Sequence, residues 1–125
     1  MATKITAEHL LRDELVYELG IRTDMEDGGR QFTVEDLRKK FRELDVEAEF
    51  GDASGLDPET ELTVCEAKLE ELSIMVKVGS SERRFESRCM HVLFRLERIH
   101  VTTYDLIAKK HRLLALPDTQ FIAFC

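Results

Sequence analysis

The sequence has few of the residues that interrupt helices. Among its 125 residues there are two prolines and six glycines, and alternating runs of β-branched residues are scarce. The charged fraction is 34%, which suits long solvated helices. Because helices need few turn residues and strands need alternation, these features predict an all-α fold.

Paired cysteines and long apolar runs are lacking as well. Cys65, Cys89 and Cys125 are an odd number at no paired spacing, which argues against a secreted disulfide framework. The opening MATKITAEHLL has no apolar stretch of signal-peptide length, and no run approaches the length of a membrane span. We therefore expect an intracellular protein, cytoplasmic or nuclear, without a membrane partner.

The sequence also lacks the patterns that carry chemistry. Its histidines lie on separate predicted helices or turns, without a nucleophile beside them: His9, His91, His100 and His111. No C-x-x-C is present, and Cys89 and His91, two positions apart, point about 200° apart on a helix. Gly28-Gly29 lacks the strand and the Lys-Ser/Thr of a phosphate loop. We expect no enzymatic activity, metal or cofactor.

What the sequence does contain is an uneven charge. Residues 1–57 carry eight Lys/Arg and fifteen Asp/Glu, whereas residues 58–125 carry ten of each. Residues 83–112 hold eight basic and three acidic side chains. An acidic protein repels phosphate as a whole, so nucleic acid would have to bind at a local basic patch.

Caps and hydrophobic spacing predict about five helices. The first helix runs from Thr6 to about Leu19, and the second begins at Thr33. The third runs from Pro58 to about Val78, and the fourth from about Glu82 to His100. The fifth follows Thr102 or Thr103 and ends before Pro117. Gly20 followed by Ile21 predicts a glycine stop after the first helix. The expected organisation is a helix–loop–helix subdomain at 1–50, a linker at 51–57, and a helical region at 58–125 that oligomerises.

The third and fourth helices share a regular apolar spacing. A link of two or three residues forces them antiparallel, as an αα-hairpin. The predicted seam consists of Leu62, Cys65, Leu69, Leu72, Val76, Phe85, Cys89, Val92, Leu96 and Ile99.

The fourth helix has a second apolar group, which consists of Met90, Leu93 and Phe94. An amphipathic face of this kind needs a cover. Either the fifth helix or a second chain can supply it. This group and the apolar end TQFIAFC indicate a homodimer or a higher homo-oligomer.

Basic residues flank the seam of the fourth helix. The candidates for nucleic-acid binding are Arg84, Arg88, Arg95 and Arg98, with Lys109, Lys110 and Arg112 further along. The other interpretation is that these arginines cover the seam and pair with acidic residues of the third helix, which offers Glu59, Glu66, Glu70 and Glu71. The second interpretation is favoured because exposed aromatics for base stacking are lacking.

The order of these segments resembles a known family. LLRDELVYELGIR followed by TVEDLRKKFREL resembles a SAP-like helix–loop–helix. With LDPETELTVCEAKLEELS and an Arg-rich helix ending RLERI, residues 7–100 are similar to the N-terminal region of gag polyproteins from insect LTR retrotransposons, or of host genes derived from them.

The resemblance implies a role in assembly or with nucleic acid. The SAP-like part would approach DNA through Arg30, Arg38, Lys39, Lys40 and Arg42. The loop DMEDGGRQ departs from that family, because it is acidic. The leading hypothesis is a non-enzymatic module for protein–protein interaction and self-association. The alternatives are nucleic-acid binding by the fourth helix and recruitment of an unknown host protein by the acidic first half.

Overall fold

The computed structural model describes residues 5–23, 31–44, 53, 55–79 and 82–120. Every regular element within these ranges is helical, which confirms the predicted all-α fold of about five helices. The elements are a 3₁₀ turn η1 (Ala7–His9) and the helices α1 (Arg12–Gly20), α2 (Val34–Leu44), α3 (Pro58–Val78), α4 (Glu82–Arg98) and α5 (Tyr104–Gln120).

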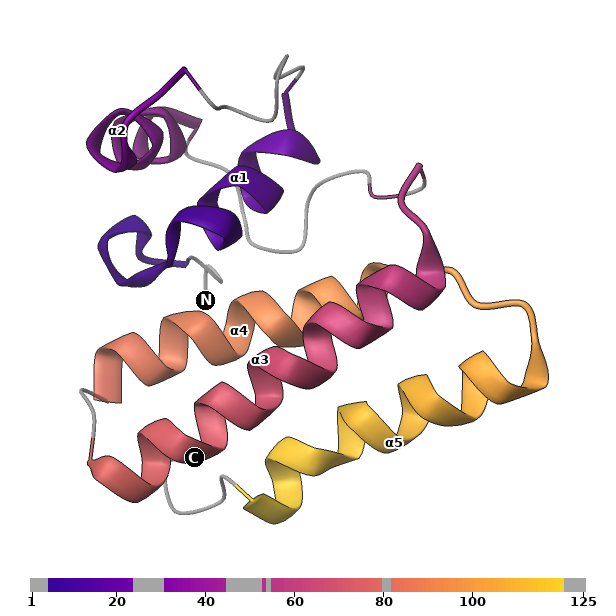
Figure 1. Ribbon diagram of the computed structural model, residues 1–125. Coiled ribbons are helices and arrows are strands. Elements are labelled where there is room, and N and C mark those ends of the chain that lie inside the picture. Colours follow the sequence, from indigo (N-terminus) through magenta and orange to yellow (C-terminus); the bar gives the residue numbers. More distant parts are fainter. Residues whose placement is uncertain (1–4, 24–30, 45–52, 54, 80–81, 121–125) are drawn as a thin grey trace.

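The helices are arranged around the α3–α4 hairpin (Figure 1). The two arms of the hairpin run antiparallel, as the short link predicts. The η1, α1 and α2 elements lie on the α4 side of the hairpin, where η1 contacts α4 and α2 packs on η1 and α1, whereas α5 lies along α3 on the other side. The hairpin therefore forms the middle of the molecule.

Local signals set the start of α2 and both ends of α3, at the positions that the sequence predicts. Asp57 caps α3, since its Oδ2 accepts a hydrogen bond from the Thr60 N–H at 2.9 Å. Gly79 ends this helix in the left-handed conformation, with φ 71°. At the start of α2, Asp36 Oδ2 accepts from the Thr33 N–H, and Thr33 Oγ1 accepts from the Asp36 N–H.

The first core of the molecule lies inside the hairpin. All ten residues of the predicted seam belong to it, with nine buried and Val76 partly buried. Leu113 of α5 joins the same core, and Leu93, from the second apolar group of α4, packs against it. The seam is thus filled within one chain.

The second core belongs to the N-terminal part. Its buried members come from η1, α1, α2 and the residues next to them: Ile5, Ala7, Leu10, Leu15, Leu19 and Leu37. Met90 and Phe94 of α4 pack against this core. The prediction that α5 or a second chain covers these two residues was therefore wrong, because the N-terminal helices cover them.

The predicted first helix is broken into two pieces. Leu10 and Leu11 have extended backbones, with ψ of 149° and 164°, so η1 and α1 are separate. The break accompanies a contact that is distant in sequence, in which the Thr6 N–H donates to Ser87 Oγ of α4 at 3.3 Å. Leu11 lies outside the core and is 39% exposed.

Two further helix ends differ from the prediction. Gly20 lies inside α1 and does not have a positive φ. Side chains complete this helix end, since Thr23 Oγ1 donates to the Leu19 carbonyl and Arg22 Nη1 to the Glu18 carbonyl. The α5 helix continues through Pro117 to Gln120. Proline has a helical φ but lacks an N–H, so this end of α5 has one intrahelical hydrogen bond fewer.

Candidate functional site

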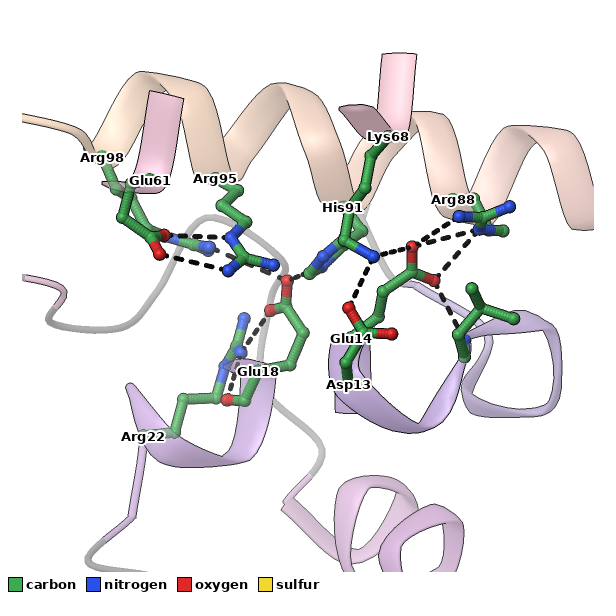
Figure 2. A network of polar contacts seen from close by, with 11 residues as sticks. Asp13, Glu14, Glu18, Arg22, Glu61, Lys68, Arg88, His91, Arg95 and Arg98 are labelled. Atoms are coloured by element: carbon green, nitrogen blue, oxygen red, sulfur yellow. Dashed lines mark hydrogen bonds and ion pairs between the residues drawn. The ribbon is translucent and has the colours of Figure 1, made fainter. Parts of the chain in front are cut away.

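The contact between α1 and the hairpin is largely ionic (Figure 2). Glu14 and Glu18 are one turn apart on α1, so both carboxylates reach the same side of the helix. That side faces the hairpin, and both side chains are fully buried. We call this contact the ionic interface. Its members are Asp13, Glu14 and Glu18 of α1, Lys68 of α3, and Arg88, His91 and Arg98 of α4.

Glu14 lies at the centre of one half of the ionic interface. Its Oε2 accepts from Arg88 Nη2 at 2.9 Å and from Lys68 Nζ at 3.1 Å, and Arg88 Nε lies 3.1 Å from both carboxylate oxygens. Lys68 Nζ also lies 2.6 Å from Asp13 Oδ2. Within α1, Glu14 Oε1 accepts from the Leu11 N–H at 3.0 Å and so caps the helix. One carboxylate thus both caps α1 and joins it to the hairpin.

Glu18 organises the other half. Its Oε2 forms a hydrogen bond with Nδ1 of His91, which is fully buried, and lies 3.8 Å from Arg98 Nη1. Its Oε1 accepts from Arg22 Nη1 at 2.6 Å within the same helix. Glu18 therefore connects α1 to two positions of α4 that are about two turns apart.

A second ion pair joins the two arms of the hairpin beside this interface. Arg95 Nε and Nη2 donate to the two carboxylate oxygens of Glu61 at 2.9 and 3.1 Å. This bidentate geometry suits the planar guanidinium. The Arg95 guanidinium also lies 4.1 Å from the centroid of the Tyr17 ring, and that ring meets His91 edge-on at 5.5 Å. Tyr17 of α1 thus packs against both Arg95 and His91 of α4.

The pKa values of the buried carboxylates show that pairing outweighs burial. Burial alone would raise the pKa of Glu14, but the hydrogen bond from Arg88, the neighbouring His91 and the Leu11 N–H lower it to about 2. Burial also opposes ionisation of Glu18, and His91 and Arg22 lower its pKa. Both groups are therefore carboxylates at neutral pH. Because an ionised carboxylate can only accept a hydrogen bond, His91 Nδ1 is the donor and Glu18 Oε2 the acceptor.

The signs of charge at this interface are divided between the two parts of the molecule. Every carboxylate of the ionic interface that is fully buried comes from α1, and the cations that face them across the contact come from α3 and α4. An unpaired buried charge costs several kcal/mol, so these groups stabilise the fold only while α1 is in place. The arrangement can recognise an acidic helix.

Most of the predicted nucleic-acid-binding residues contact carboxylates or carbonyls of their own chain. Arg88, Arg95 and Arg98 pair with Glu14, Glu61 and Glu18, as described above. The remaining candidates are Arg84, exposed near the start of α4, Lys109 and Arg112, which pair with Glu66, and Lys110, whose Nζ donates to the Glu97 and Ile99 carbonyls.

The arginines of α4 were also predicted to pair with glutamates of α3. Arg95 does pair with an α3 glutamate, Glu61. Glu71 lies 3.6 Å from Arg88, whereas Glu66 pairs with α5.

The candidates from the SAP-like resemblance lie on the outer side of α2. Arg38 pairs with Glu35 and Arg42 pairs with Glu8. Lys40 Nζ lies 4.5 Å from the centroid of the Phe32 ring, and Lys39 is exposed. Arg30 lies outside the described residues. DNA contact by this helix stays a prediction.

Sequence reasoning missed the residues that hold α1 on the hairpin. It assigned no role to Glu14, Glu18, Glu61, Lys68 or His91. Two signals were present: carboxylates four positions apart beside Leu15 and Leu19, and opposite local charge in the two halves of the chain. Neither signal says that the carboxylates turn inward.

The cysteines and histidines do not gather. Cys65 and Cys89 are buried in the hairpin core, and burial raises the pKa of Cys65 to about 12, so its thiol is protonated. Cys89 and His91 point to different neighbours, the seam and Glu18. Cys125 lies outside the described residues. Among those described, no group of three or more His, Cys, Asp or Glu is placed to hold a metal ion.

Comparison of the chain with protein-family models, with curated proteins and with solved structures finds no match. In the part of the chain that the structure describes, no helix is long and apolar enough to cross a membrane.

Proposed function

We propose that this protein is a non-enzymatic protein–protein interaction module that self-associates, in the assembly role that its resemblance to gag proteins implies. The observation that carries the proposal is the outer surface of α3 and α5. Tyr104 and Ile107 of α5 are 84% and 38% exposed, and Ile74 and Val78 of α3 are 57% and 70% exposed.

The α5 helix is apolar on two sides. Leu106, Leu113 and Leu114 face the hairpin core, whereas Tyr104 and Ile107 face solvent. Tyr104 and Ile107 are three positions apart, so they lie on one side of α5. Large apolar side chains that are exposed together favour association, because burying them removes apolar area from water. A tyrosine adds large contact area at low entropic cost, which is why it is enriched at interfaces.

The ion pairs weigh against nucleic-acid binding by α4. A phosphate that approached Arg88, Arg95 or Arg98 would have to displace a carboxylate that already holds the guanidinium within the protein. Displacement would also leave buried carboxylates unpaired, at a cost of about 3–5 kcal/mol each. Association through the exposed side chains of α5 needs no such rearrangement, so self-association is the function that we favour.

Light scattering of the full chain tests this proposal. The mass should rise above the 14.5 kDa of one chain as the protein concentration reaches high micromolar values. A Tyr104→Ser/Ile107→Ser variant should stay closer to a monomer. Leu56→Ser is the matched control, because Leu56 is 42% exposed and lies outside α5, so this change should leave the mass as in the wild type.

A wild-type protein that stays monomeric at these concentrations would contradict the proposal. Titration with RNA and DNA in the same buffers tests the alternative. Binding that weakens steeply with salt and is lost in an Arg84→Ala variant would favour nucleic-acid binding instead.

A further inference from the structure

We infer that the ionic interface is an exchangeable docking site, in which the hairpin of one copy takes the α1–α2 unit of a second copy. The inference rests on the proposed self-association and adds to it a second surface, distinct from the outer side of α5, with one partner, a second copy of this chain. Three features of the molecule carry it: its two separate cores, the division of charge between its parts, and the connection between them.

The first feature is that each part has its own core. The buried residues of the N-terminal core come from residues 5–37, and those of the hairpin core come from residues 62–113. Across the contact, the apolar side chains that join the N-terminal core are Met90 and Phe94 of α4. The N-terminal unit can therefore leave and dock again as one body, in which its own buried residues stay together while the contacts with Met90 and Phe94 are given up and remade.

The second feature is that the charges of the ionic interface are complementary across the contact. The N-terminal unit brings Glu14 and Glu18, and the hairpin brings Lys68, Arg88 and Arg98. An undocked hairpin exposes cations, and an undocked α1 exposes carboxylates, so each attracts the other part of any copy. Like parts repel each other, which directs the partner choice to α1 on hairpin.

The third feature is the connection. Residues 45–57 lie between α2 and α3 in the chain, and a segment of this length spans at most about 45 Å when extended. A docked and an exchanged arrangement contain the same contacts, so they differ mainly in chain entropy and in protein concentration. Exchange therefore needs no new complementary surface, and it becomes favourable as concentration rises.

A disulfide across the interface reports the exchange directly. The Thr6 N–H donates to Ser87 Oγ at 3.3 Å, so residue 6 of the N-terminal unit lies beside residue 87 of the hairpin. The test uses two full-length variants, T6C and S87C, each in a Cys125→Ser background. Each variant carries one of the two introduced cysteines. A bond between the two introduced thiols then requires two chains.

The two variants are mixed at equal amounts, unfolded and refolded together at rising concentrations, and oxidised mildly. Exchange predicts a covalent heterodimer whose yield rises with concentration and whose linked peptides contain positions 6 and 87. The matched control is T6C mixed with S73C, because Ser73 lies on α3 at a solvent-exposed hydrogen bond to the Glu70 carbonyl, outside the ionic interface. The heterodimer should exceed this control at least several-fold.

The double variant T6C/S87C shows whether the geometry allows the disulfide. It should close within one chain at low concentration. If it closes, and the mixture yields no more heterodimer than the control, the exchange is wrong. If the wild type nevertheless assembles in light scattering, self-association stands and uses another surface. If the wild type is a monomer as well, the proposed function fails together with the exchange.

Discussion

The two interfaces of α4 differ in what they are made of. Toward α3, α4 presents Phe85, Val92 and Leu96 in a dry seam. Toward α1, it presents Arg88 and His91, which meet buried carboxylates. An apolar seam stabilises with any well-packed neighbour, whereas a buried ionic contact stabilises only when each charge finds its partner. One helix thus has a tolerant side, the apolar seam toward α3, which accepts different apolar neighbours. It also has a specific side, the ionic contact toward α1, which needs matching charges.

The largest expected effect comes from putting a charge into the tolerant side. Leu96→Asp leaves an unpaired carboxylate in the hairpin core and removes its packing, so it should cost about 4–5 kcal/mol of unfolding free energy. Urea or thermal unfolding followed by circular dichroism measures this loss. The control is Ile74→Asp on the exposed side of α3, with an expected change below about 1 kcal/mol. Equal effects of the two changes would show that the seam is misplaced.

The next effect comes from breaking the specific side. Glu14→Ala leaves Lys68 and Arg88 buried without their main carboxylate, and should cost about 3–5 kcal/mol. Glu35→Ala is its control, since Glu35 pairs with Arg38 at the surface with its side chain 78% exposed, and exposed pairs contribute less than about 1 kcal/mol. The unfolding free energies of the two variants give the comparison. A cost for Glu14→Ala as small as that of Glu35→Ala would mean that α1 does not depend on its charges.

The pH dependence separates the two sides without changing the seam. The pKa of Glu14 is lowered from 4.5 to about 2 in the folded protein. A lowered pKa stabilises the fold above the unfolded value, and this contribution, about 3 kcal/mol, is lost as the pH falls from about 4.5 toward 2. Glu18, whose pKa is also lowered, acts in the same direction.

Urea unfolding at a series of pH values between 6 and 2 measures the loss. The Glu14→Gln variant should show a flatter curve in this range. A curve of the same slope in that variant would assign the acid sensitivity to other groups.

The smallest expected effect is the most discriminating. Glu61→Leu alone leaves Arg95 buried and unpaired, which should cost about 3 kcal/mol, whereas the double change Glu61→Leu/Arg95→Met should return to within about 1 kcal/mol of the wild type. Here an ionic pair would be converted into an extension of the apolar seam. Stability measurements on both single variants and the double variant complete the cycle. If the double variant is as unstable as Glu61→Leu, the ion pair stabilises the fold more than an apolar pair at the same place does.

Sequence reasoning was accurate where a structure depends on neighbours in the chain. Asp57 and Gly79 mark the ends of α3 because a cap and a left-handed turn are decided within four residues. The seam followed from spacings of three and four, which any helix converts into one face. It failed where distant contacts decide, as in the break at Leu10–Leu11, which accompanies the bond between Thr6 and Ser87. The ionic interface was missed for the same reason, since Glu14 pairs with residues 54 and 74 positions away.

By itself, the sequence determined five helical segments, the hairpin and its apolar seam, because hydrophobic spacing and caps act locally. Only the tertiary structure decided what the charged residues do. A glutamate beside a leucine on α1 and an arginine beside an apolar residue on α4 are both suited to solvent. Packing α1 against α4 buries them together, and removal of water is what makes each of them require the other.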